Sequence, residues 1–214
     1  MTQPSFDFSS EPDQEAFDTA LLQSAMTLAA RDGWSRLSLV EAAREAGLPV
    51  DAVRARFPFR HSVLFHLGRI ADDSALRDDG MGSSVRERLF DMLMRRLDVF
   101  QQYREGVRAA LRALPFDPPL AVLLAGATMN TLRWLAEAAG LDLDGPAGLL
   151  RLHALAALWA GTLRAWEKDE SDDLAATMSA LDRGLDRAER LGMLKPSRAD
   201  RPAGAAPLSD LTIN

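Results

Sequence analysis

The sequence predicts an all-α protein, and three observations support this fold class. Alanine and leucine are abundant whereas tyrosine occurs once. Long runs of alternating β-branched residues are missing, and apolar residues recur at helical spacing along most of the chain. With 214 residues, of which 47% are hydrophobic and 26% charged, the chain can bury a large core as one domain or two.

The composition also excludes several kinds of site. The chain has no cysteine, which excludes disulfides and cysteine nucleophiles and fits a reducing cytoplasm. Three scattered histidines give no metal-ligand spacing, and no phosphate-binding glycine loop or Gly-x-Ser-x-Gly motif is present. The N-terminus lacks a signal pattern and the apolar stretches are too short to span a bilayer. We therefore expect a cytoplasmic protein that is not an enzyme, uses no metal or cofactor, and does not insert stably into a membrane.

The first third of the chain begins with an acidic arm and a helix. Residues 1–12 are polar and acidic, and we expect them to be disordered. From about Asp13 to Arg31 the apolar residues share one helical face, and Asp32-Gly33 ends the helix. Trp34 follows and is expected in a small core. The apolar face consists of Phe17, Leu21, Leu22, Ala25, Met26, Leu28 and Ala29.

Residues 36–60 predict two short helices joined by a tight turn. Ser38 and Glu41 form a capping-box pattern, which begins a helix that ends at Gly47. Pro49 suits the first turn of the next helix, expected over residues 50–57. Two helices joined in this way form a helix-turn-helix, which places its second helix in the major groove of DNA.

Charge is distributed unevenly along the chain. The net charge is -6, and residues 1–30 contain five acids and no base. Residues 31–69 contain seven arginines and four acids, a local net charge of +3. Because the local field at a contact face decides whether DNA binds there, this basic window favours nucleic-acid binding within an acidic chain.

The rest of the chain predicts longer helices. Residues 78–83 are rich in glycine and serine and predict a domain boundary, and Ser84 and Glu87 form a second capping box. The helices expected after the turn cover about 60–73, 84–100, 104–114, 118–139, 145–168 and 172–192. The expected domains are therefore 13–77 and 84–192, followed by a flexible tail over 193–214.

Residues 21–67 resemble the TetR family of bacterial transcriptional regulators. The family pattern is an alanine-rich helix, a glycine-aromatic turn, a hydroxyl-capped helix, an Ala-Gly turn, and a recognition helix ending in an aromatic residue, with a basic residue soon after. The matching residues are Ala25, Gly33-Trp34, Ser38, Ala46-Gly47, Arg56-Phe57 and Arg60. The resemblance implies a TetR-like fold, with an N-terminal three-helix helix-turn-helix subdomain followed by a larger helical bundle. It also implies a homodimer that binds operator DNA and a small-molecule effector.

The recognition helix departs from the family pattern. Asp51 and Ala52 stand where small hydroxyl residues are usual, and Arg54 and Ala55 where tyrosines are usual. Arginine binds phosphate or guanine bidentately and can replace those contacts. The candidate DNA contacts are Arg36, Ser38, Pro49, Val50, Arg54, Arg56 and Arg60, although Ser38 is equally explained by capping alone.

Residues 85–190 are similar to a second family, the lipid-binding accessory protein of ubiquinone biosynthesis, which itself has a TetR-like fold. The matching residues are Val85-Arg86, Arg88-Leu89, Tyr103 to Glu105, Leu114-Pro115, Trp134, Ala139-Gly140, Asp169, Ser171 and Leu181 to Arg183. Residues 141–146 lack the aromatic residues of that family, and a polar tail replaces its amphipathic membrane helix. This resemblance implies an alternative function, a lipid- or quinone-binding accessory protein that does not bind DNA.

The body also supplies candidates for an effector site. Methionine and tryptophan suit an adaptable cavity for a lipid or other apolar ligand. The candidate ligand-binding residues are Phe100, Met129, Trp134, His153, Trp159 and Thr162. An ordinary bundle core explains each of them as well. The apolar stripes of the last two helices fit either a dimer interface or an internal core.

Overall fold

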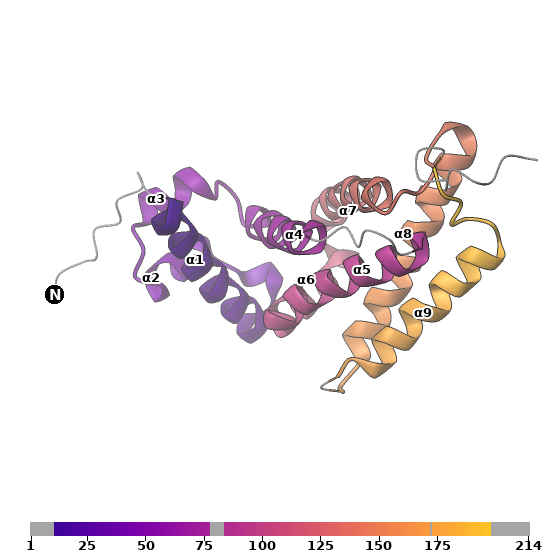
Figure 1. The fold of residues 1–214 in the computed structure, drawn as a ribbon. Helices are drawn as coiled ribbons and strands as arrows, with labels where there is room; N and C mark the ends of the chain where they lie inside the picture. The colour runs from indigo at the N-terminus through magenta and orange to yellow at the C-terminus, as the bar shows by residue number, and fades with distance from the viewer. Residues whose placement is uncertain (1–10, 78–83, 172, 198–214) are drawn as a thin grey trace, which may run out of the picture. The chain divides into compact units, whose positions relative to one another are not determined.

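The computed structural model describes residues 11–77, 84–171 and 173–197, and these residues are all-α (Figure 1). The elements in chain order are α1 (Glu11–Asp32), η1 (Trp34–Arg36), α2 (Leu39–Glu45), α3 (Val50–Arg56), α4 (His61–Leu76), α5 (Val85–Gln102), α6 (Arg104–Ala113), η2 (Leu114–Phe116), α7 (Pro118–Ala138), α8 (Gly145–Lys168) and α9 (Ala175–Arg190). The predicted boundary over 78–83, and most of the predicted arm and tail, lie outside the described residues.

The predicted fold class is confirmed, and the helices differ from the sequence prediction mainly at their ends. α1 begins at Glu11 rather than Asp13, and α9 covers 175–190 rather than 172–192. The two short 3-10 helices, η1 and η2, were not predicted. Such single turns lack the periodic apolar pattern of a longer helix, so the sequence gives little signal for them.

The described chain divides into two compact units. Unit 1 contains α1 to α4, the second half of α5, all of α6 and the first half of α7. Unit 2 contains the first half of α5, the second half of α7, α8 and α9. The helix-turn-helix therefore shares its unit with α6.

Unit 1 is organised around α1. The seven apolar residues predicted to share one face of α1 are all buried, and α1 packs against α2, α4, α6 and η1. Gly106 of α6 lies against Met26 of α1. A Cβ at residue 106 would lie 2.7 Å from the Met26 carbonyl oxygen and 2.8 Å from its Cβ. Glycine is thus what allows the two helices to approach this closely.

A buried ion pair joins α4 to the second half of α5 within unit 1. The Arg96 side chain is 6% exposed and forms an ion pair with Asp72. Its guanidinium carbon lies 5.3 Å from the centre of the Phe100 ring, a cation–π contact. Burial lowers the pKa of Arg96 to about 10, so the guanidinium remains charged near neutral pH. The Asp72 carboxylate compensates this buried charge.

Unit 2 contains the antiparallel pair α8 and α9 (Figure 1). Gly184 of α9 lies against Leu158 of α8, where an added Cβ would lie 3.0 Å from the leucine Cγ. The connection is held by Asp169, whose carboxylate accepts bonds of 2.7 Å from both the backbone N and the Oγ1 of Thr177. Burial would raise the pKa of Asp169, but hydrogen bonds from Ser171 and Thr177 outweigh it and hold the pKa well below its usual range.

The beginning of α5 is fixed within unit 2 by a cap and an ion pair. The Glu87 backbone N–H donates to Ser84 Oγ at 3.2 Å, and the Ser84 N–H donates to Glu87 Oε2 at 3.0 Å. This confirms the predicted capping box. Within the same turn, Arg86 Nε donates to Asp186 Oδ1 of α9 at 3.1 Å.

Within the described residues, no single helix has both the length and the apolar composition needed to cross a membrane. The bent pair formed by residues 104–116 and 118–138 meets those limits only when its two parts are taken together.

Candidate nucleic-acid interface

The predicted helix-turn-helix is present as α2 and α3. Gly47 has a φ of 68° in the turn between them, a left-handed conformation that favours glycine. Pro49 precedes the first residue of α3 with an extended backbone. Ala43 of α2 and Val53 of α3 are buried, so the inner faces of both helices pack into unit 1.

The outer face of α3 is accessible. Val50 is 38% exposed, and Asp51 and Arg54 are also exposed. Val53 and Phe57 are buried. Of the candidate DNA contacts, Val50 and Arg54 therefore lie on the accessible side of α3, and the exposed Pro49 immediately precedes them.

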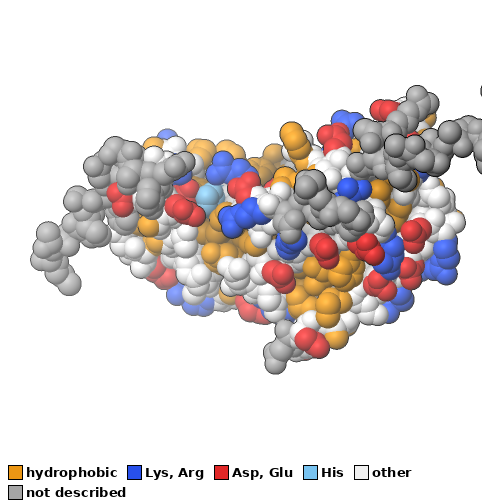
Figure 2. Space-filling model, viewed as in Figure 1, with side chains coloured by type: hydrophobic (Ala, Val, Ile, Leu, Met, Phe, Trp, Pro, Cys, Tyr) orange, Lys and Arg blue, Asp and Glu red, His pale blue; other side chains and the backbone are white. Residues whose placement is uncertain are grey.

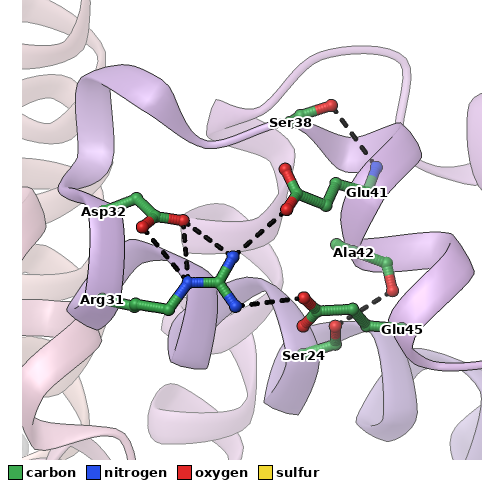
Figure 3. Close-up of polar contacts among 7 residues, drawn as sticks. All are labelled: Ser24, Arg31, Asp32, Ser38, Glu41, Ala42 and Glu45. Atoms are coloured by element: carbon green, nitrogen blue, oxygen red, sulfur yellow. Dashed lines mark hydrogen bonds and ion pairs between the residues drawn. The ribbon is translucent and has the colours of Figure 1, made fainter.

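Ser38 caps α2, and only half of its predicted capping box is formed. Its Oγ accepts a hydrogen bond from the Glu41 backbone N–H at 3.4 Å (Figure 3). The Glu41 carboxylate does not accept the second hydrogen bond of the box, from the Ser38 backbone N–H. It accepts instead from Arg31 Nη2 at 3.1 Å, so the acid of the box joins α2 to α1.

Arg31 is the centre of an exposed ionic network at the end of α1 (Figure 3). Its guanidinium donates to Asp32 at 2.9 Å, to Glu41 at 3.1 Å and to Glu45 at 3.3 Å. The hydrogen bond to Asp32 is the largest of the effects that raise the pKa of Arg31. Three acids thus neutralise one of the seven arginines that made this window basic.

Arg56, at the end of α3, points toward α1. Its Nε and Nη2 donate to the two carboxylate oxygens of Asp18, the second at 2.6 Å, and its Nη1 donates to Gln14 Oε1 at 3.4 Å. The Asp18 side chain is 5% exposed and that of Arg56 37%. The hydrogen bond to Asp18 raises the pKa of Arg56 above its usual value, so this arginine is charged at neutral and mildly alkaline pH.

Arg60 is also engaged within unit 1. Its Nη2 donates to Asp117 Oδ2 at 2.9 Å and its Nη1 to the Ser35 carbonyl oxygen at 3.1 Å. Asp117 caps α7 by accepting from the Leu120 N–H at 3.0 Å, and this bond is the main reason that the pKa of Asp117 is lowered. His61 Nε2 lies 3.7 Å from the same carboxylate. Arg60 therefore links η1, the beginning of α4 and the beginning of α7.

Among the exposed arginines of η1, α2 and α3, three form no side-chain hydrogen bond or ion pair within the described residues: Arg36, Arg44 and Arg54. Arg44 was counted in the basic window but was not among the candidate DNA contacts selected from the sequence. Asp18 and Asp117 were missed as well. They lie 38 and 57 residues from the arginines that they bind, a separation at which sequence spacing carries no signal.

The candidate ligand-binding residues differ in their surroundings. In unit 2, Trp159 and Thr162 are buried, and Thr162 Oγ1 donates to the Leu158 carbonyl oxygen at 3.1 Å. Trp134 is 60% exposed, and the exposed His153 has its Nδ1 2.8 Å from the Leu149 carbonyl oxygen. Met129 is half-buried in unit 2 and Phe100 half-buried in unit 1.

The face shown in Figure 2 does not present one basic field. Figure 2 shows acidic and basic side chains side by side on the face in view, with apolar side chains between them. A shallow, open hollow lies on the outer face of α1, where it is lined by Glu15, Ala16, Thr19, Ala20 and Gln23. Its lining carries an acid and no base, which is unlike a surface for a phosphate.

Comparison with solved structures identifies the fold. The chain is similar to a TetR transcriptional regulator from Nitrosomonas europaea, with a TM-score of 0.70 and 21% identity over 82% of this chain and 99% of that chain. A TetR regulator from Rhodococcus gives a TM-score of 0.55 at 20% identity, over 84% of this chain and 98% of that chain. A third, from Streptomyces coelicolor, gives 0.51 at 18% identity, over 84% and 86%.

No protein-family model and no curated protein matches the sequence. The structural matches nevertheless cover nearly all of the first two regulators. The predicted resemblance of residues 85–190 to the accessory protein is not addressed by them and stays a prediction. The chain has the fold of the TetR transcriptional regulators.

Proposed function

We propose that the protein is a DNA-binding transcriptional repressor of the TetR type. The observation that carries the proposal is the outer face of α3, where Arg54 is exposed and forms no ion pair within the described residues, next to the accessible Pro49 and Val50. Arg36 and Arg44 provide two further exposed cations on neighbouring elements. Each can bind a phosphate or a base edge bidentately.

A band-shift titration against the DNA upstream of the protein's own gene tests this proposal. Wild-type affinity should fall steeply with salt, because arginines that neutralise phosphates release counterions. Arg54→Ala should weaken binding by about tenfold or more, since a good bidentate contact contributes about 1–3 kcal/mol. Arg77→Ala, which removes an exposed arginine at the end of α4, is the matched control and should bind as the wild type. Salt-insensitive binding, or an unchanged Arg54→Ala, would contradict the proposal.

The repressor is proposed to act as a homodimer through α8. One side of α8 carries Leu149 and Leu150, which are 59% and 57% exposed, and the exposed small residues Ala157 and Gly161. Small residues permit the close approach of a second helix, and exposed leucines favour burial. Leu150→Glu should shift the mass measured by light scattering toward that of a monomer. Val122→Glu, at an exposed site of α7, serves as the control for added charge.

An apolar small molecule bound in the helical body is the proposed effector. Within unit 2, the buried Trp159 and the half-buried Met129 are the candidates that support an apolar site. Native mass spectrometry of the purified protein, followed by band-shift assays with any compound found, tests this point. A co-purified isoprenoid together with no DNA binding at low salt would favour the accessory-protein alternative instead.

A further inference from the structure

The two arginines of α3 point in different directions. Arg54 and Arg56 are two residues apart on a helix, so their side chains project about 200° apart around its axis. Arg54 is on the exposed outer face, whereas Arg56 reaches Gln14 and Asp18 of α1. They are therefore not equivalent candidates for DNA contact.

The guanidinium of Arg56 is already engaged in the free protein. Arginine binds a phosphate through a pair of parallel N–H groups, and the Nε and Nη2 edge of Arg56 makes that type of contact with the Asp18 carboxylate. Nη1 is directed to Gln14. To bind a phosphate through that edge, Arg56 would have to leave Asp18 as an unpaired buried carboxylate, which is unfavourable.

Aromatic packing supports the same contact between the end of α3 and α1, which we call the Asp18–Arg56 joint. Phe57, the residue after Arg56, is buried and lies edge-on to His66 of α4 with ring centres 5.6 Å apart. His66 Nδ1 in turn lies 3.8 Å from Asp18 Oδ2. The last turn of α3 is therefore held between α1 and α4.

We propose that Arg56 is a positioning residue for DNA recognition: with Asp18 it fixes the last turn of α3 on α1, so that Arg54 faces the DNA. Arg56 itself adds no phosphate contact. This inference rests on the proposed DNA binding, but the joint that it describes exists in the free protein and can be measured without DNA.

The decisive variant is Asp18→Asn, because two roles of Arg56 predict opposite signs. If Arg56 positions α3, the variant frees that helix end, and DNA affinity falls by about tenfold when one molecule in ten keeps the binding geometry. If Arg56 contacts phosphate, the variant releases its guanidinium and removes a negative charge, and affinity rises. If the ion pair only adds stability, affinity measured well below the unfolding temperature is unchanged. Either of the last two results overturns the proposal.

Salt dependence gives a second readout. A dimer that loses one phosphate contact per half-site should show a slope of log K against log salt that is smaller by about 1.8. Arg54→Ala is expected to show this change. Arg56→Ala is expected to weaken binding while keeping the wild-type slope, and a smaller slope in Arg56→Ala would contradict the proposal.

The double variant Asp18→Asn/Arg56→Gln distinguishes loss of the pair from general unfolding. Two amides can hydrogen-bond without either charge, so a paired role predicts that the double variant binds DNA no worse than either single change. Additive effects of the two changes would argue against a paired role.

Hydrogen exchange in the free protein separates this inference from the proposed function. Amides of α3 should exchange about tenfold faster in Asp18→Asn than in the wild type, and at the wild-type rate in Arg54→Ala. Unchanged exchange in Asp18→Asn would refute the joint. A wild-type protein that binds no DNA would refute the proposed function while leaving the exchange result to stand by itself.

Discussion

Helix α1 holds the helix-turn-helix at two places that use the same charges in different surroundings. Near its C-terminal end, Arg31 binds Asp32, Glu41 and Glu45, and all four side chains are at least 39% exposed. In its N-terminal half, Asp18 binds Arg56 with only 5% of the acid exposed. The first contact is a solvated network, whereas the second pairs a buried acid with a partly exposed arginine.

The comparison shows that the number of ion pairs at a contact does not predict how much that contact stabilises the position of α3. Exposed pairs gain little, because water and salt screen them and the long side chains lose freedom. A buried acid has lost its hydration, so removing its partner leaves an uncompensated charge. The three contacts of Arg31 are therefore expected to contribute less to the position of α3 than the single pair of Asp18.

Breaking the buried joint should have the largest effect. Asp18→Ala removes the buried carboxylate that accepts two hydrogen bonds from Arg56. We expect the free energy of unfolding to fall by about 2–3 kcal/mol, because a hydrogen bond to a charged group typically contributes about 1.5–3 kcal/mol. Urea titration followed by circular dichroism measures this change. Asp51→Ala, at an exposed acid of α3, is the matched control and should stay within about 0.5 kcal/mol of the wild type. Equal effects of the two changes would refute the ranking.

The contact of α1 with α6 should be the next most sensitive. Gly106→Ala places a Cβ 2.7 Å from the Met26 carbonyl oxygen, and overpacking of this kind destabilises by about 1–3 kcal/mol. Gly126→Ala is the control, because nothing lies within 4 Å of a Cβ added there in α7. The control should raise stability by up to about 1 kcal/mol, since alanine favours helix over glycine. The two glycines should thus respond with opposite signs in the same thermal unfolding experiment.

Loss of the α2 cap should have a moderate effect. Ser38→Ala removes the Oγ that accepts from the Glu41 N–H, which typically lowers stability by about 1 kcal/mol. Ser38→Asp keeps an acceptor and should restore the wild-type unfolding temperature. If both variants unfold alike, capping does not explain the role of Ser38.

These residues also show what the sequence could and could not predict. The all-α fold, the apolar face of α1 and both serine caps followed from local patterns, because helical spacing and capping are short-range. The seven basic residues between 31 and 69 were visible as well. The partners of these arginines could not be predicted, because Arg31, Arg56 and Arg60 each bind acids that tertiary packing brings close to them.

The grouping of the helices into two units had no sequence signal for the same reason. A break at 78–83 is suggested by its glycines, but the grouping of α6 with the helix-turn-helix depends on Gly106 meeting Met26, 80 residues earlier in the chain. Residues that act through a distant partner are therefore the ones that sequence reasoning misassigns, and Arg56 is the clearest case.

Acid pH should weaken the buried joint through His66. Burial is the main reason that the pKa of His66 is lowered from 6.5; Asp18 raises it, while Arg69 and Arg56 lower it further. The unfolded chain binds a proton near pH 6.5 and the folded chain only at lower pH. The free energy of unfolding should therefore fall as the pH drops below about 6.5. His66→Gln should flatten that fall, and His153→Gln, at an exposed histidine, should not.

The exposed joint should give the smallest change in stability. Arg31→Ala removes three ion pairs, yet we expect an unfolding temperature close to that of the wild type, and no difference in about 1 M salt, where such pairs are screened. The loss caused by Asp18→Ala should persist in the same salt. Arg31→Ala should act instead on DNA association at low salt, because it leaves Glu41 and Glu45 without their cation and adds repulsion from phosphate. A large, salt-independent loss of stability in Arg31→Ala would mean that exposure does not distinguish the two joints.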